Sequence, residues 1–163
     1  MLQHAFGQAL TVQELGVLKQ AFLTAYRQVL AVSAPCFFPG VEQVIETLNR
    51  YQIPFGVVTN KHQCYAECIL AKAFFSKNLA TVVYGDTLKT PKPSPEPLYL
   101  ACRQLTIACE DTWFVGDGRV DMQSAQAAGC VAVLASYGYV EADWRSWPAA
   151  HILHELTDLL SLL

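Results

Sequence analysis

The sequence carries little charge and no basic surplus. Charged residues make up 15% of its 163 positions, and the formal net charge is −3. A chain of this kind has little with which to neutralise a phosphate backbone, so we expect no nucleic-acid partner. The hydrophobic fraction of 53% excludes an intrinsically disordered chain.

Long apolar runs are missing as well. Runs such as Phe55–Val58 are too short to cross a bilayer, so we expect no membrane partner. The first 15 residues lack the basic start and apolar stretch of a signal peptide. These absences, together with the length, predict a cytoplasmic globular protein of about one domain.

The six cysteines include no Cys-x-x-Cys pair. Cys64 and Cys68 are four residues apart in a helical stretch, so they share a face, and His62 lies nearby. A zinc site would need further ligands at matched spacing, and none completes the set. We therefore interpret the cysteines as buried free thiols in a reducing compartment.

Helical periodicity and short apolar runs alternate along the chain. The pattern predicts helices at residues 11–32, 41–51, 61–75, 98–105 and 120–128, and a last helix in the C-terminal tail. It predicts strands at residues 54–59, 81–84, 112–115 and 130–134, with a short one in the tail. Thr11 and Glu14 have the form of a capping box, and Gly129 ends its helix. Apolar strands alternating with helices indicate an α/β fold with a doubly wound parallel sheet.

Ligands of such sheets bind beyond the carboxyl ends of the strands. Thr59 and Asn60 follow one strand, where a hydroxyl and free backbone N–H groups could hold an anion or simply cap the next helix. Lys92 stands between two prolines, which stiffen its backbone. It is either a phosphate-binding cation or an ordinary surface lysine.

Asp117 and Asp121 are four residues apart, where a strand gives way to a helix. Two carboxylates so placed suit Mg²⁺, which also binds water and phosphate oxygens; the alternative is an N-cap aspartate with a solvated neighbour. A phosphate cradle, a cation and a metal site on adjacent loops together indicate phosphoryl transfer.

Three segments carry a specific resemblance. VVTNK, KPSPEPL and FVGDGRVDMQSAQAAG resemble, in order and spacing, the second, third and fourth motifs of the haloacid-dehalogenase superfamily. From about Leu10 to Leu163 the chain is similar to its phosphoglycolate-phosphatase-like members. The resemblance implies a Rossmann-like core at residues 37–163, a partial helical cap at residues 1–36, and Mg²⁺-dependent hydrolysis of a phosphomonoester through an aspartyl-phosphate.

The resemblance also implies roles for the residues singled out above. Thr59 and Asn60 would hold the phosphate, and Lys92 would balance charge on the phosphate and the nucleophile. Asp117 would bind Mg²⁺, and Asp121 would assist it directly or through water. The substrate would be a small phosphorylated metabolite, either 2-phosphoglycolate or a sugar phosphate such as N-acetylmuramic acid 6-phosphate.

The family's first motif, an apolar strand ending in Asp-x-Asp-Gly-Thr, has no counterpart here. Its first Asp is the nucleophile and its second the general acid and base, and this sequence contains no Asp-x-Asp. Asp86 follows a strand, but no carboxylate stands two residues on. We therefore expect the chain alone to have little or no turnover. The alternative is a non-catalytic remnant that binds phosphate or a protein partner.

The missing motif has a structural consequence. The resemblance implies that the absent strand is central and lies between the strand ending at Thr59 and the strand ending at Val115. Without it, these two strands either pair with each other or keep unpaired backbone groups. The first helix loses its cap partners too, and its apolar stripe needs cover; the stripe comprises Leu15, Leu18, Phe22, Tyr26 and Leu30. We expect a homodimer that buries this helix, the alternative being a monomer whose helix folds back on its own sheet.

Overall fold

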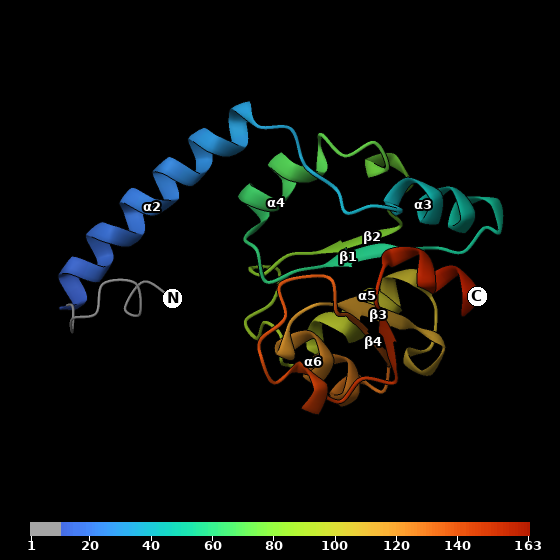
Figure 1. Ribbon diagram of the computed structural model, residues 1–163. Helices are drawn as coiled ribbons and strands as arrows, with labels where there is room; N and C mark the ends of the chain where they lie inside the picture. Colours follow the sequence, from blue (N-terminus) through green and yellow to red (C-terminus); the bar gives the residue numbers. More distant parts are fainter. Residues whose placement is uncertain (1–10) are drawn as a thin grey trace.

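A computed structural model describes residues 11–163 of the chain (Figure 1). Helices and strands alternate after a long first helix. The α-helices are α2 (Val12–Val32), α3 (Val41–Arg50), α4 (Gln63–Leu70), α5 (Glu96–Leu105) and α6 (Arg119–Ala128). The strands are β1 (Gly56–Val58), β2 (Thr81–Val83), β3 (Trp113–Gly116), β4 (Val131–Ala135) and β5 (His151–Leu153). Short 3-10 helices are η1 (Ser76–Asn78), η2 (Cys109–Asp111), η3 (Trp144–Ser146) and η4 (Leu156–Ser161).

The order of elements agrees with the sequence pattern. The capping box of Thr11 and Glu14 is present, and Gly129 ends α6 in the left-handed conformation at φ 76°. The helix expected at 61–75 is wrong in extent, because α4 ends at Leu70. Beyond it, the chain turns so that Phe75 reaches Phe37, with ring centroids 5.6 Å apart. The last helix is a 3-10 helix, η4.

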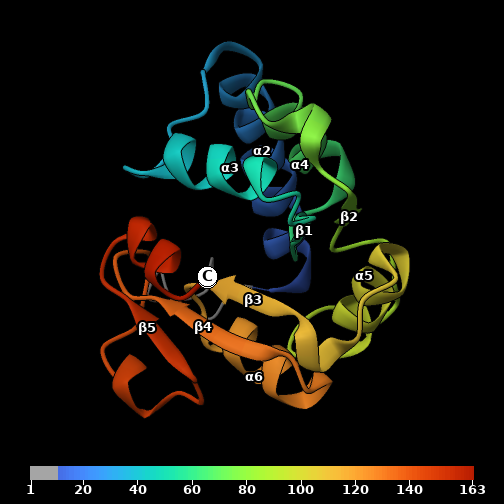
Figure 2. The ribbon, with the colours of Figure 1, turned by 90° about the vertical axis from the view of Figure 1, so that its right-hand side faces the viewer.

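All strand pairs are parallel, but the strands form two sheets. β1 pairs with β2, while β3, β4 and β5 form a second sheet in that order. β1 and β3 are the inner strands of the two sheets and do not pair with each other (Figure 2). Of the two alternatives for the missing strand, the structure therefore shows the one in which the flanking strands stay apart.

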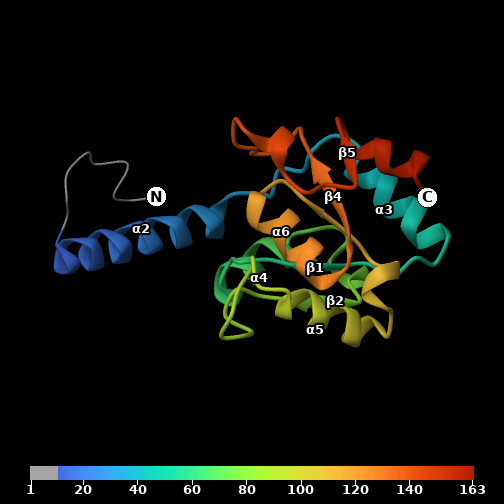
Figure 3. The same ribbon diagram turned by 90° about the horizontal axis from the view of Figure 1, so that it is seen from below.

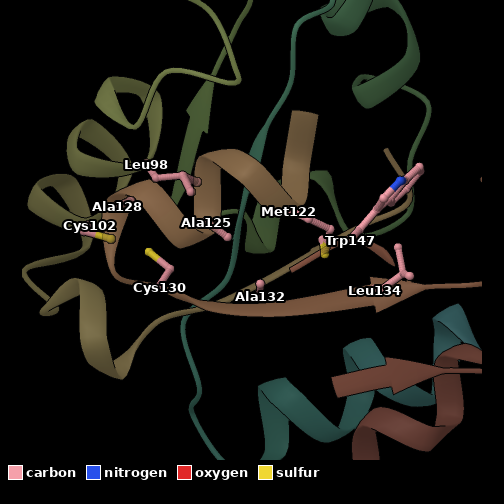
Figure 4. Packing of buried hydrophobic residues seen from close by; sticks show 9 residues of the cluster. All are labelled: Leu98, Cys102, Met122, Ala125, Ala128, Cys130, Ala132, Leu134 and Trp147. Atoms are coloured by element: carbon pink, nitrogen blue, oxygen red, sulfur yellow. The ribbon is translucent and has the colours of Figure 1, made fainter. Parts of the chain in front are cut away.

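Helices cover both faces of the strands, as a doubly wound fold requires. On one face, α6 packs over β3 and β4, and α5 packs over β1 and β2 and against α6; the two helices enclose a buried cluster (Figure 4). Its members are Leu98, Cys102, Met122, Ala125, Ala128, Cys130, Ala132, Leu134 and Trp147. On the other face, α3 and η4 pack against each other and bury a second cluster: Val44, Leu48, Val133, Leu153 and Leu159. These two clusters fix the positions of the strand ends.

The cysteines divide into two groups. Cys102 and Cys130 are buried side by side (Figure 4), and their sulfurs and that of half-buried Cys109 lie within 4.8 Å of one another. Burial raises the pKa of the Cys130 thiol, so it packs as a small apolar group. The expectation of buried thiols is wrong for the other three, which are exposed; they are Cys36, Cys64 and Cys68.

The first helix contacts α4, where the Tyr26 and Tyr65 ring centroids lie 5.4 Å apart. α2 contains no buried residue and projects from the body of the molecule (Figures 1 and 3). Lys72 Nζ donates to the carbonyls of Leu30, Ala31 and Ser33 at 2.7–3.0 Å, which satisfies the C-terminal end of α2. The division into a cap at residues 1–36 and a core at 37–163 stays a prediction.

Within residues 11–163, no helix is both long and apolar enough to cross a membrane.

Candidate functional site

The loop after β1 is tied to the proline-rich loop by one side chain. Asn60 Nδ2 donates to the carbonyl of Lys92 at 2.9 Å, and Asn60 Oδ1 accepts from the backbone N–H of Lys92 at 3.0 Å. Both polar atoms of the amide are therefore engaged with backbone. The Asn60 side chain therefore fixes where Lys92 stands. These bonds do not use its second Nδ2 hydrogen, and its contact with phosphate stays a prediction.

Lys92 is a buried cation, with 8% of its surface exposed. Its Nζ donates to the Val58 carbonyl at 2.8 Å and pairs with Asp121 Oδ1 at 2.7 Å. The same ammonium lies 5.0 Å from the centroid of the Phe114 ring. An ammonium has three donors, and these two bonds leave one for a ligand. The alternative of an ordinary surface lysine is wrong.

Asp121 lies in the first turn of α6, and both of its carboxylate oxygens have partners. Oδ1 faces Lys92, and Oδ2 accepts from the backbone N–H of Gly118 at 3.0 Å. A Cβ at position 116 would stand 2.7 Å from Oδ2, so Gly116 is what lets the carboxylate approach the strand end. Asp121 thus orients Lys92 and the turn before α6, and both of its oxygens are engaged in doing so.

Asp117 is held differently. Its Oδ2 accepts from the backbone N–H of Tyr139 at 2.9 Å, while Oδ1 has no partner within residues 11–163. A Cβ at position 138 would lie 2.5 Å from the Asp117 Cβ, so Gly138 makes room for this side chain. The turn at 137–139 therefore fixes one oxygen of Asp117 and leaves the other available to a cation.

Thr59 follows the last residue of β1. Its Oγ1 accepts from the backbone N–H of Lys61 at 3.0 Å, a turn that leaves its hydroxyl proton free to donate. The N-cap of α4 is His62, and Asp86 Oδ1 accepts from the backbone N–H of Gln63 at 2.8 Å. Thr59 is therefore not the cap of the next helix. The Gln63 bond also lowers the pKa of Asp86.

The structure thus links Asn60, Lys92 and Asp121 by direct bonds, with Thr59 and Asp117 on the adjoining strand ends. The sequence pattern singled out these five residues, but it could not show which of them have polar groups free for a ligand. Thr59, Lys92 and Asp117 each keep a polar group free for a ligand, whereas Asn60 and Asp121 are bonded to Lys92. The contacts of all five with phosphate or metal stay predictions. The contributions of Gly116 and Gly138 were not foreseen, because their role is the space that a side chain would occupy.

Comparison with known proteins identifies the family of the chain. Residues 2–135 match the family of haloacid dehalogenase-like hydrolases. The chain belongs to this family.

Several members resemble the chain along much of its length. It is 33% identical to the N-acetylmuramic acid 6-phosphate phosphatase of Pseudomonas aeruginosa, covering 100% of this chain and 73% of that protein. It is 35% identical to the phosphoglycolate phosphatase of Escherichia coli over 78% of this chain, and it spans 50% of that relative. A solved structure from Haemophilus somnus, described as a predicted phosphoglycolate phosphatase, superposes with a TM-score of 0.83 at 25% identity. That superposition covers 98% of this chain and 71% of the other, so the haloacid dehalogenase-like, phosphoglycolate-phosphatase-like assignment holds for sequence and fold alike.

Proposed function

We propose that this haloacid dehalogenase-like chain carries the phosphate-binding and metal-binding residues of a Mg²⁺-dependent phosphomonoester phosphatase. The observation that supports this most is the buried ammonium of Lys92, which has one donor to spare at the strand ends. The substrate class is a small phosphorylated metabolite. Both 2-phosphoglycolate and N-acetylmuramic acid 6-phosphate fit this proposal, since the matched relatives are named for these two substrates.

Three side chains would contact the phosphate or its counter-ion. The Thr59 hydroxyl and the third donor of Lys92 would bind phosphate oxygens, and the free Oδ1 of Asp117 would bind the metal. Asn60 and Asp121 would act through Lys92, by fixing its backbone and its ammonium. This division follows from which polar atoms already have partners in the fold.

The donor set fits Mg²⁺. Hard divalent cations take carboxylate oxygens, and Asp117 presents one that is free within residues 11–163. Without a metal cation, the negative charge of the Asp117 and Asp121 carboxylates exceeds the positive charge of the Lys92 ammonium. A phosphate dianion would then be repelled. Bound Mg²⁺ would reverse that balance and stabilise charge on the phosphate oxygens. The engaged oxygens of Asp121 favour assistance through water over direct ligation.

The chain lacks a residue for covalent catalysis in the manner of its family. The sequence contains no Asp-x-Asp, and no second carboxylate stands two residues after Asp86. Asp86 also accepts from Gln63 and faces His62, at the start of α4. We therefore expect binding without efficient turnover. A protein that binds phosphate without catalysis, or that binds a protein partner, is the second candidate.

Calorimetric titration tests whether the chain has a Mg²⁺-dependent phosphate site. Inorganic phosphate should bind in the presence of Mg²⁺, and removing the metal should weaken binding at least about tenfold, because the uncompensated carboxylates repel it. Asp117→Asn should lose most of the metal dependence. Glu46→Gln on the exposed face of α3 is the matched control and should bind as the parent does. No heat with or without Mg²⁺ would contradict the proposed site.

A further inference from the structure

Three cysteine sulfurs meet at one end of the cluster that α5 and α6 enclose. They belong to Cys102 in α5, to Cys109 at the start of η2, and to Cys130 between α6 and β4. The three Sγ atoms lie within 4.8 Å of one another. These residues are far apart in sequence and match no short ligand motif, so their convergence is a property of the fold.

Thr112 ties the three cysteines together. Its backbone N–H donates to the Cys109 carbonyl at 3.0 Å, and its own carbonyl accepts at 2.9 Å from Val131, the residue after Cys130. The Cys102 Sγ donates to the Thr112 hydroxyl oxygen at 3.5 Å. The fold therefore holds the three sulfurs near one another before any ligand binds, which lowers the cost of binding one.

The group consists of sulfur alone. Among residues 11–163, no His, Asp or Glu atom belongs to it. Sulfur ligands select Zn²⁺ and other thiophilic metals, whereas Mg²⁺ takes oxygen ligands. A metal at the usual zinc–sulfur distance holds three sulfurs roughly 3.8–4.0 Å apart, so movements of about 1 Å would complete the site.

The surroundings favour a divalent ion. Cys102 and Cys130 are 3% and 7% exposed and lie among apolar side chains. Three thiolates leave one net negative charge around a divalent ion and two around Cu(I). Because unpaired charge is costly in an apolar environment, the smaller residual charge is preferred.

An ion can reach the sulfurs from the surface. Cys109 is only half-buried, and it lines a surface hollow together with Cys102. The hollow is bordered by Glu96, Tyr99 and Arg103. The cluster thus has an entry path, which a metal site needs.

This cluster is separate from the proposed phosphate site. Cys130 directly precedes β4, and Cys109 lies in η2, just before β3. Figure 4 shows Cys102 and Cys130 at the end of the buried cluster away from Leu134. Lys92, by contrast, lies at the carboxyl ends of the strands, where it contacts the Val58 carbonyl.

We propose that Cys102, Cys109 and Cys130 together bind one thiophilic divalent metal ion, of which Zn²⁺ is the best fit. On binding, each thiol releases its proton to solvent, and three metal–sulfur bonds replace three S–H bonds without any change of oxidation state. Water completes a tetrahedral set. The alternative is that the three thiols only fill space as small apolar groups.

The experiment titrates the full chain, reduced and freed of metal by a chelator, with Cd²⁺. Sulfur-to-cadmium charge transfer absorbs in the ultraviolet, and its intensity counts the thiolates bound. The absorption should saturate at one ion per chain with the intensity of three thiolates. Zn²⁺ should displace the Cd²⁺ and abolish the absorption, whereas Mg²⁺ should leave it unchanged.

Two variants locate the ion. Cys109→Ser removes the half-buried ligand, so it should lose the three-thiolate intensity and bind Zn²⁺ at least about tenfold more weakly. Cys64→Ser is the matched control, because Cys64 is exposed and lies outside the group. It should bind Cd²⁺ as the parent does.

Chemical protection needs no variant. Zn²⁺ should slow alkylation of Cys109 by iodoacetamide at least about tenfold, as mass spectrometry of its peptide would show, because a metal-bound thiolate is shielded. Exposed Cys36 should react equally with and without Zn²⁺. Absence of the charge-transfer absorption, its loss in Cys64→Ser, its full retention in Cys109→Ser, or unchanged alkylation of Cys109 would each overturn the proposal.

Discussion

Lys92 Nζ lies 2.7 Å from Asp121 Oδ1, and both side chains are almost fully buried, with 8% and 12% of their surfaces exposed. The same ammonium holds the Val58 carbonyl, so one cation joins the end of β1 to the start of α6. β1 and β3 do not pair directly, and this contact links the two sheets at the carboxyl ends of these strands.

Breaking this ion pair should destabilise the protein strongly. Lys92→Met leaves the Asp121 carboxylate buried without its counter-ion, which costs about 3–5 kcal/mol of unfolding free energy. The double variant Lys92→Met with Asp121→Leu should recover much of that loss. Urea denaturation of the four proteins in the cycle measures both effects.

The exposed pair of Arg119 and Asp143 is the matched comparison for that cycle. Asp143→Asn should cost no more than about 1 kcal/mol, because solvent screens the pair. If breaking the buried pair and breaking the exposed pair lowered the free energy of unfolding equally, the Lys92 contact would contribute no more to stability than a surface ion pair.

Asn60 should matter for stability as well as for ligand binding. Asn60→Ala removes two part-buried hydrogen bonds to the Lys92 backbone and leaves their partners unsatisfied. We expect a loss of about 1–3 kcal/mol in the free energy of unfolding, measured by urea denaturation. Asn78→Ala removes one exposed contact to Asn49 and should change it by less than about 0.5 kcal/mol. The interpretation fails if both variants behave alike.

Two glycine-to-alanine substitutions should change the stability of the protein in opposite directions. Gly116→Ala puts a Cβ 2.5 Å from the Asp121 Cβ and should lower stability by about 1–3 kcal/mol. Gly16→Ala on α2 meets nothing within 4 Å and should raise stability by about 0.5–1 kcal/mol, since alanine favours a helix. Thermal denaturation measures both. A stabilising Gly116→Ala would mean that Asp121 is not fixed against the strand end.

The uncovered surface of α2 predicts self-association. Several of its apolar side chains are exposed: Val12 (89%), Val17 (66%), Phe22 (54%), Val29 (55%) and Val32 (86%). Such a surface favours a partner, and we expect a homodimer through α2. Light scattering at micromolar concentration should give twice 18.0 kDa, and Phe22→Lys should shift the protein toward the monomer. A monodisperse 18 kDa species with a cooperative melt would contradict this.

Much of this molecule could be predicted from local chemistry. Alternating apolar runs and helical periods gave the order of elements and the doubly wound parallel arrangement, and the five polar residues at the strand ends were identified by residue type. The pattern could not show that Asn60 and Asp121 are both bonded to Lys92, because Lys92 is far from either of them in sequence. It also could not show that α4 ends at Leu70 and that Phe75, beyond it, packs against Phe37, which is distant in sequence.

The most direct test of the central claim is phosphatase turnover by the purified chain. Released phosphate is measured with 2-phosphoglycolate and with p-nitrophenyl phosphate as substrates, once in the presence of Mg²⁺ and once with a chelator. We predict phosphate binding in the presence of Mg²⁺ together with release no faster than buffer, because the sequence has no Asp-x-Asp to supply the nucleophile. Robust Mg²⁺-dependent release that disappears in Asp117→Asn would contradict the account.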